Sequence, residues 1–238
     1  FVAELTPVDY ESCFVDAYRR LSKAIDEAGF QEGAAAVSAY VSGQLCVLAC
    51  AGDARAVLYD HDGSIRATTF DHKPHSLREM DRIRAAGGFV TENGRVNGTL
   101  GLSRAVGDGP FQPMVTHVPD VVLAPLQGAP SCLVLACDGV WDVMTRRQVW
   151  SLVATEKAPA RAALAIRDFA HCLGSTDTIS VVVVYLNDFG DDAARARHAE
   201  AVLRQEAALA LERKRPEGSR SSSIDSRTAS LLFLGSET

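Results

Sequence analysis

Residues 36–60 read AVSAYVSGQLCVLACAGDARAVLYD, and this stretch decides the fold class. Its apolar runs are short and rich in Val and Ala, as is typical of buried β-strands. The dipeptides Ser42-Gly43 and Gly52-Asp53 interrupt these runs at points where turns are expected. The stretch therefore predicts a meander of strands that follow one another along the chain.

A helix is predicted before this meander, over residues 7–28. Thr6 is placed to cap its first turn, and Pro7 lies where a missing backbone N–H costs nothing. Gly29 is a typical residue to follow the last turn. Apolar side chains at helical spacing form one stripe that should face a core: Phe14, Tyr18, Leu21 and Ile25.

The rest of the chain predicts helices grouped between strands. Ser76 and Glu79 have the spacing of a capping box and open a helix that stops at Gly87. Residues 89–117 are expected to form a long functional loop with short strands. Further strands are expected at 121–124, 132–137 and 179–185, the last covered on both faces, and helices at 145–153 and 158–173. This pattern favours an α+β fold with a sandwich of β-sheets.

The composition argues against several classes of protein. A formal net charge of −6 over 238 residues disfavours nucleic-acid binding through a diffuse basic surface. No apolar run approaches the roughly 18 residues that span a bilayer, so no membrane protein is expected. The six cysteines include no C-x-x-C pair, which favours buried, reduced thiols in a cytoplasmic or nuclear protein.

Three aspartates lie where predicted strands end or begin. Asp53 follows LCVLACAG, Asp138 follows CLVLAC, and Asp177 precedes TISVVVVY. If the strands next to Asp138 and Asp177 pair antiparallel, the two carboxylates converge at one edge of a sheet. Ligands that are all oxygen suit Mg²⁺ or Mn²⁺. The alternative is that each aspartate caps a turn, since Gly-Asp and Asp-Gly are common turn dipeptides.

Five motifs together resemble a known family. They are ACAGDARAVLYD (49–60), DHKPHSLREMDRIRAAGGFV (71–90), GRVNGTLGLSRAVGD (94–108), LVLACDGVWDVM (133–144) and GSTDTISVVVV (174–184). In this order they resemble the metal-dependent Ser/Thr protein phosphatases of type 2C. The resemblance implies a four-layer αββα sandwich over residues 1–186, and an enzyme that hydrolyses phosphoserine and phosphothreonine in phosphorylated proteins.

The resemblance also implies roles for four carboxylates. Asp138 and Asp177 match the family's ligands to a first metal, and Asp53 matches the residue that holds a further, weaker metal with Asp138. Asp142 matches an outer carboxylate that orients bound water. The implied cofactor is Mg²⁺ or Mn²⁺, and the implied nucleophile is a metal-bound water rather than a protein side chain.

The sequence also departs from the family. Its N-terminal motif, Asp-Gly-His-Gly-Gly, does not occur in the 238 residues, and the chain is expected to begin just downstream of it. Ala34 and Ala35 replace a Gly-Ser-Thr pattern, and Thr178 replaces an asparagine. These changes keep an alternative open, a pseudophosphatase that serves as a binding or scaffold module. We expect this chain itself to hydrolyse phosphate esters weakly.

Other segments carry weaker expectations. Arg104 either faces a phosphate or braces its loop through Asp108, and the brace is favoured. His72 and Lys73 are expected to fix a turn before Pro74. Residues 187–238 are expected to form a charged helix and a Ser-rich disordered tail, which could instead mark a regulatory domain of a larger protein. The protein is expected to be a monomer.

Overall fold

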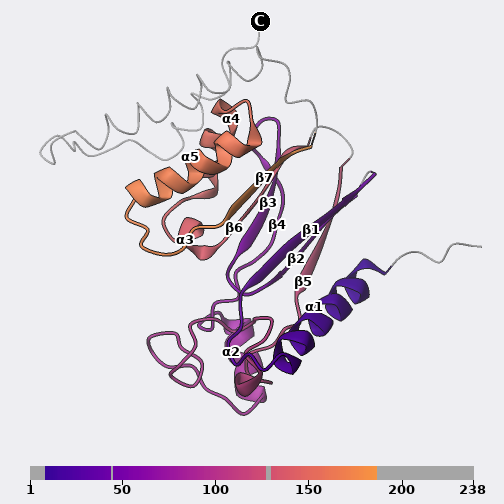
Figure 1. Cartoon of the computed structure of the whole chain (residues 1–238), viewed down its shortest axis with the longest axis vertical. Helices are drawn as coiled ribbons and strands as arrows, with labels where there is room; N and C mark the ends of the chain where they lie inside the picture. The colour runs from indigo at the N-terminus through magenta and orange to yellow at the C-terminus, as the bar shows by residue number, and fades with distance from the viewer. Residues whose placement is uncertain (1–8, 44, 127–129, 187–238) are drawn as a thin grey trace, which may run out of the picture. The chain divides into compact units, whose positions relative to one another are not determined.

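The computed structural model describes residues 9–43, 45–126 and 130–186, which Figure 1 shows in colour. The predicted meander is present as successive strands: β1 (Ala36–Ser42), β2 (Leu45–Ala51), β3 (Arg55–Asp60) and β4 (Ile65–Thr68). Gly52 makes the turn between β2 and β3 with φ of 120°, a value that L side chains rarely adopt. The strand meander is therefore confirmed.

The strands form two antiparallel sheets. The first has the order β1-β2-β5, with β5 at Asp120–Pro125. The second has the order β4-β3-β6-β7, with β6 at Pro130–Ala136 and β7 at Val181–Tyr185. Because β2 belongs to the first sheet and β3 to the second, the chain crosses between sheets at the turn that carries Asp53.

Alternating side chains build the inner core of the sandwich. Leu48 of β2, Leu58 of β3 and Leu133 of β6 belong to one buried cluster between the sheets. Val57 and Tyr59 of β3 belong instead to a cluster that includes helical residues. Because successive side chains of a strand point to opposite faces, β3 is covered on both sides.

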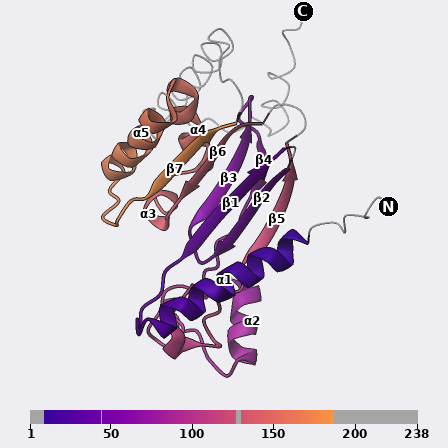
Figure 2. The same cartoon turned by 45° about the vertical axis from the view of Figure 1, so that its right-hand side comes forward.

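Helices cover the outer face of each sheet (Figures 1 and 2). Helix α1 (Tyr10–Glu27) packs on the first sheet, where the Tyr18 hydroxyl donates to the Ala49 carbonyl over 3.1 Å. Helices α4 (Arg146–Thr155) and α5 (Pro159–Cys172) cover the second sheet. The predicted α+β fold, with its four αββα layers, is confirmed. No helix in the described part of the chain is long and apolar enough to cross a membrane.

Two details of α1 differ from the sequence prediction. Its N-cap is Asp9, whose carboxylate accepts from the Ser12 backbone N–H over 3.1 Å, whereas Thr6 lies outside the described residues. Leu21 is 48% exposed, and the buried position one residue later belongs to Ser22. The hydroxyl of Ser22 accepts from the Gly107 backbone N–H, so a polar contact fills the buried place beside the exposed Leu21.

The two predicted capping residues of helices behave differently. Ser76 holds the N-cap position of α2 (Leu77–Ala85) without a side-chain hydrogen bond, and Glu79 is 2% exposed and points inward. The predicted capping box of α2 is therefore wrong, because Glu79 forms buried ion pairs instead. Thr145 does cap α4, and it forms a capping box with Gln148.

The last strand also differs from the prediction. Val181, Val183 and Tyr185 pack against the core under α4 and α5. Val182 is 55% exposed and Val184 37% exposed, so β7 is covered on one face and not on both. β7 lies at the edge of the second sheet, next to β6. The expected charged helix and tail at 187–238 lie outside the described residues.

The predicted long loop between α2 and β5 has a small core of its own. Ile83 of α2 and three loop residues, Val96, Ala105 and Val115, are buried together. The loop contains a short 3-10 turn, Gly109–Phe111, and isolated β-bridges. These contacts tie the loop to α2. The expected short strands do not form in this segment, where the pairing is limited to isolated bridges.

Candidate metal centre

The pairing of β6 with β7 brings the segments of Asp138 and Asp177 together. Ala136 of β6 pairs with Val181 of β7, so the antiparallel pairing that the sequence argument took as its condition is present. Beyond this pair, the Cys137 N–H donates to the Ser180 carbonyl over 3.2 Å, and the Cys137 thiol donates to the Thr178 carbonyl over 3.1 Å. The chain thus holds Asp138 and Asp177 at the same edge of the sheet.

Gly139 allows a close approach of these two segments. A Cβ at this position would lie 2.8 Å from the Thr178 carbonyl oxygen and 3.4 Å from the Asp177 Cβ. The Ser175 hydroxyl also donates to the Gly139 carbonyl over 2.6 Å. A larger residue at position 139 would therefore push Asp177 away from Asp138.

The surroundings of Asp138 are partly buried and negatively charged. Burial raises the pKa of Asp138 above its ordinary value, and the negative charges of Asp53 and Asp177 raise it further. A hydrogen bond from the Gly139 N–H and the charge of Lys73 oppose this shift. Asp138 thus lies among negative charges at a partly buried site, as expected of a carboxylate that a cation would stabilise.

Asp53 reaches this site from the turn between the two sheets. It is 7% exposed and follows Gly52, where an added Cβ would meet the Ala35 Cβ at 2.5 Å. The His72 N–H donates to the Gly52 carbonyl over 2.9 Å, and the His72 ring Nδ1 lies 3.2 Å from the Gly52 nitrogen. Tight packing and His72 therefore fix the backbone that presents Asp53.

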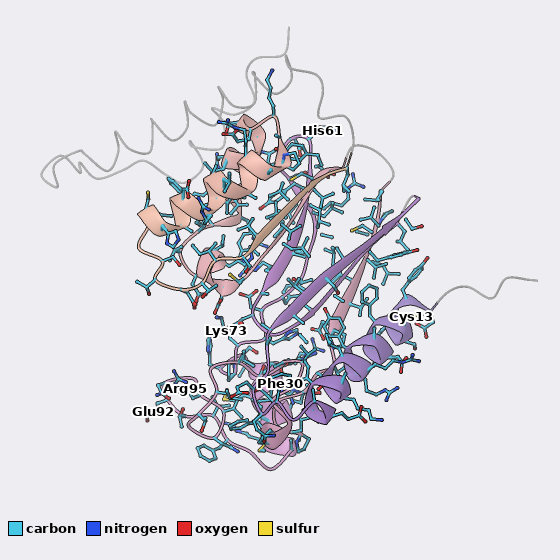
Figure 3. The ribbon with its side chains drawn as sticks, viewed as in Figure 1. Cys13, Phe30, His61, Lys73, Glu92 and Arg95 are labelled. Atoms are coloured by element: carbon cyan, nitrogen blue, oxygen red, sulfur yellow. The ribbon has the colours of Figure 1, made fainter. Side chains whose placement is uncertain are left out.

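Lys73 lies between Asp53 and Asp142. Its Nζ donates to Oδ2 of Asp53 over 2.8 Å and lies 3.5 Å from Oδ1 of Asp142. Figure 3 shows Lys73 below α3 (Asp138–Trp141), while His61 in the β3–β4 turn lies at the opposite end of the strands. Burial by itself would lower the pKa of Lys73, but the hydrogen bond and charge of Asp53, with the charges of Asp142 and Asp138, raise it.

The segment around Lys73 is held on both sides. Asp71 accepts two hydrogen bonds from the Arg55 guanidinium, at 2.9 and 2.7 Å, and Arg55 lies over the Trp141 ring at 5.0 Å. His72 holds Gly52, as described above. The sequence interpretation of His72 and Lys73 as residues that fix a turn therefore missed the contact of Lys73 with two site carboxylates. The available signal was the place of DHKP inside a family motif.

Arg104 is a brace, but its partner differs from the expected one. It is 4% exposed, and its guanidinium donates to the carboxylates of Glu79 and Asp120 and to the Val118 carbonyl. The expected brace through Asp108 is wrong. Because Arg104 is buried in this network, the structure also gives no support to its facing a phosphate.

The donor chemistry of the site fits a hard divalent cation. Mg²⁺ and Mn²⁺ take oxygen ligands, and Asp53, Asp138, Asp142 and Asp177 supply carboxylate oxygens. The Lys73 ammonium already forms ion pairs with two of them, Asp53 and Asp142. Within residues 9–43, 45–126 and 130–186, no three His, Cys, Asp or Glu side chains are gathered so as to hold a metal ion together. In this arrangement, Lys73 supplies positive charge to both Asp53 and Asp142.

Two proteins with similar sequences are named as protein phosphatases. Protein phosphatase 1G of Homo sapiens is 37% identical over 140 residues, which are 55% of this chain and 26% of that protein. Protein phosphatase 2C homolog 1 of Saccharomyces cerevisiae is 37% identical over 135 residues, which are 57% of this chain and 47% of that protein. The chain thus spans between a quarter and a half of the length of these relatives.

A solved structure and a family model extend the comparison. The structure of a C. elegans sex determining protein superposes with a TM-score of 0.68 at 29% identity, and covers 76% of this chain and 46% of that one. The family model of protein phosphatase 2C matches residues 4–179, which include Asp53, Asp138, Asp142 and Asp177. The chain belongs to the protein phosphatase 2C family.

Proposed function

We propose that this chain carries the metal-binding part of a Mg²⁺- or Mn²⁺-dependent protein serine/threonine phosphatase. The observation that carries the proposal is the place of Asp138 and Asp177 side by side at one end of the β6–β7 pair, with the charge of Asp53 near enough to act on Asp138. Carboxylates that repel one another persist in a fold when a cation stabilises them. The relatives are named protein phosphatases, which supports phosphorylated proteins as the substrate class.

In this proposal, Asp138 and Asp177 hold the first metal, and Asp53 holds a weaker one together with Asp138. A bound divalent cation would lower the pKa of a coordinated water and neutralise phosphoryl oxygens. Asp142 would orient water at the site, and its 58% exposed side chain supports this role. Gly139 keeps the Asp138 and Asp177 segments close together, while His72 positions the turn of Asp53.

A second candidate, a metal-free binding module, is favoured by one observation. Lys73 already neutralises part of the negative charge by its ion pairs with Asp53 and Asp142. In this reading, the carboxylates and Lys73 form a structural ion-pair network in a pseudophosphatase, and no metal is needed to hold the segments together.

The test that separates the two candidates is Mn²⁺ binding to the 238-residue chain, followed by electron paramagnetic resonance, with phosphothreonine-peptide hydrolysis as the second readout. We expect saturable Mn²⁺ binding that Asp138→Asn removes. The matched control is Asp168→Asn, which removes an exposed carboxylate on α5 and should leave Mn²⁺ binding unchanged. Because the 238 residues contain no Asp-Gly-His-Gly-Gly motif, we expect slow turnover. Mn²⁺ binding that is absent, or unaffected by Asp138→Asn, would favour the binding module.

A further inference from the structure

We propose that Lys73 is a built-in competitor of the metal at Asp53. In this proposal its ammonium group occupies the Asp53 carboxylate from the side of Asp142, and a divalent cation gains access to Asp53 only when Lys73 leaves. The inference rests on the proposed function, because it concerns the weaker of the two proposed metal positions. In this proposal, Lys73 controls the affinity of the weaker metal position for a divalent cation.

The contacts of Lys73 support this role. Its Nζ lies 2.8 Å from Asp53 Oδ2, so it uses a carboxylate oxygen that a metal would also need. It lies 3.5 Å from Asp142 Oδ1, so one ammonium group joins two carboxylates from different parts of the chain. A divalent ion bound beside a charged lysine would meet repulsion between two cations in a partly buried place.

The neighbours of Lys73 fix its backbone but leave its side chain a way out. Asp71 is held by Arg55, and His72 is held against Gly52. The Lys73 side chain is 27% exposed and the Asp142 side chain 58% exposed, so the pair borders solvent. A flexible four-carbon stem can therefore swing the ammonium into water without a change in the fold.

Electrostatics gives the direction and the scale of the effect. When a metal displaces Lys73, the ion pair with Asp53 is broken, and the ammonium remains nearby. One unit charge at about 4 Å changes a binding constant by about fivefold in bulk water and by more in a partly buried site. Neutral residues at position 73 should therefore tighten the weaker metal position by about tenfold.

The experiment is a Mn²⁺ titration of the full chain followed by electron paramagnetic resonance. Lys73→Met should bind the second Mn²⁺ about tenfold more tightly than the wild type, while Lys73→Arg keeps a charge and should stay weak. Lys23→Met removes a lysine that is 66% exposed on α1, and it should change nothing. The double variant Lys73→Met with Asp53→Asn should lose the gain, because the tightened position includes Asp53.

The outcomes distinguish this inference from the proposed function. If the wild type binds Mn²⁺ through Asp138 but Lys73→Met has the same isotherm, the competitor role is wrong and the proposed metal centre stands. If neither the wild type nor Lys73→Met binds Mn²⁺, both proposals fail. Circular dichroism of each variant checks folding, and Lys73→Gln provides a second neutral variant with a polar side chain if Lys73→Met does not fold.

Discussion

The Arg104 guanidinium donates from Nε to Oε1 of Glu79 over 3.0 Å, and both side chains are almost fully buried, at 4% and 2% exposure. Glu79 belongs to α2, whereas Arg104 belongs to the loop that follows it. The Ser103 hydroxyl also donates to Glu79, over 2.9 Å. The Arg104 guanidinium donates in addition to the carboxylate of Asp120, at the start of β5. One buried network therefore joins α2, the loop and the first sheet.

Breaking this pair should destabilise the fold strongly. Arg104→Met removes the guanidinium and leaves the buried Glu79 short of its main partner, which we expect to cost about 3–5 kcal/mol in the free energy of unfolding. Urea denaturation measures the change. The matched control is Arg84→Met, which removes an exposed arginine whose pair with Asp81 spans 3.7 Å, and which should cost less than about 1 kcal/mol. Equal losses for both variants would contradict a structural role for the buried pair.

The same network should make stability depend on acid pH. Burial by itself would raise the pKa of Glu79, but the hydrogen bond and charge of Arg104, with Ser103 and Arg82, lower it from 4.5 to about 2. The folded pKa lies below the unfolded one, so this stabilisation is complete above pH 4.5 and is lost as the pH falls towards 2.

Urea midpoints between pH 6 and pH 2.5 measure this dependence. The Glu79→Gln variant cannot titrate at this position, so its stability should fall less steeply over the same range than that of the wild type. Glu92→Gln, in an exposed part of the loop, provides a control that should keep the wild-type slope. Identical slopes for the wild type and Glu79→Gln would mean that other groups produce the acid sensitivity.

Gly139 should control the metal centre without contributing a ligand. In Gly139→Ala, the added methyl group meets the Thr178 carbonyl oxygen at 2.8 Å, which forces the Asp177 segment away from Asp138. We expect Mn²⁺ affinity to fall by about tenfold, as for changes in groups that position ligands. Gly101→Ala is the matched control, because a Cβ there meets nothing within 4 Å. Unchanged Mn²⁺ binding in Gly139→Ala would show that the close approach is not required.

The cysteines should differ sharply in reactivity. Burial raises the pKa of Cys46 to about 11, and burial with the charges of Asp71 and Asp53 raises the pKa of Cys50 to about 12. Cys13 and Cys172 are exposed free thiols. With a thiol reagent at pH 8, peptide mapping should find these two modified first and the two buried thiols modified only after unfolding in urea. Rapid modification of Cys50 in the folded chain would contradict its buried environment.

Much of the fold was predictable because strand and helix periodicity are local properties. The meander of residues 36–60 and the Thr145 cap of α4 both follow from short patterns. The capping box at Ser76 and Glu79 fails although its spacing is correct. The Glu79 carboxylate forms an ion pair with Arg104, which lies 25 residues away in the sequence, and makes no hydrogen bond at the start of its own helix.

The sequence by itself determined the α+β class, the succession of strands along the chain and the positions of Asp53, Asp138 and Asp177 next to strand ends. The tertiary structure alone decided that Lys73 pairs with Asp53 and Asp142, and that Arg104 braces Glu79 rather than Asp108. The physical reason is the distance along the chain over which each kind of interaction acts. Periodicity and turn chemistry act over a few residues, whereas an ion pair forms between whichever charges the folded sheets bring within a few ångströms of each other.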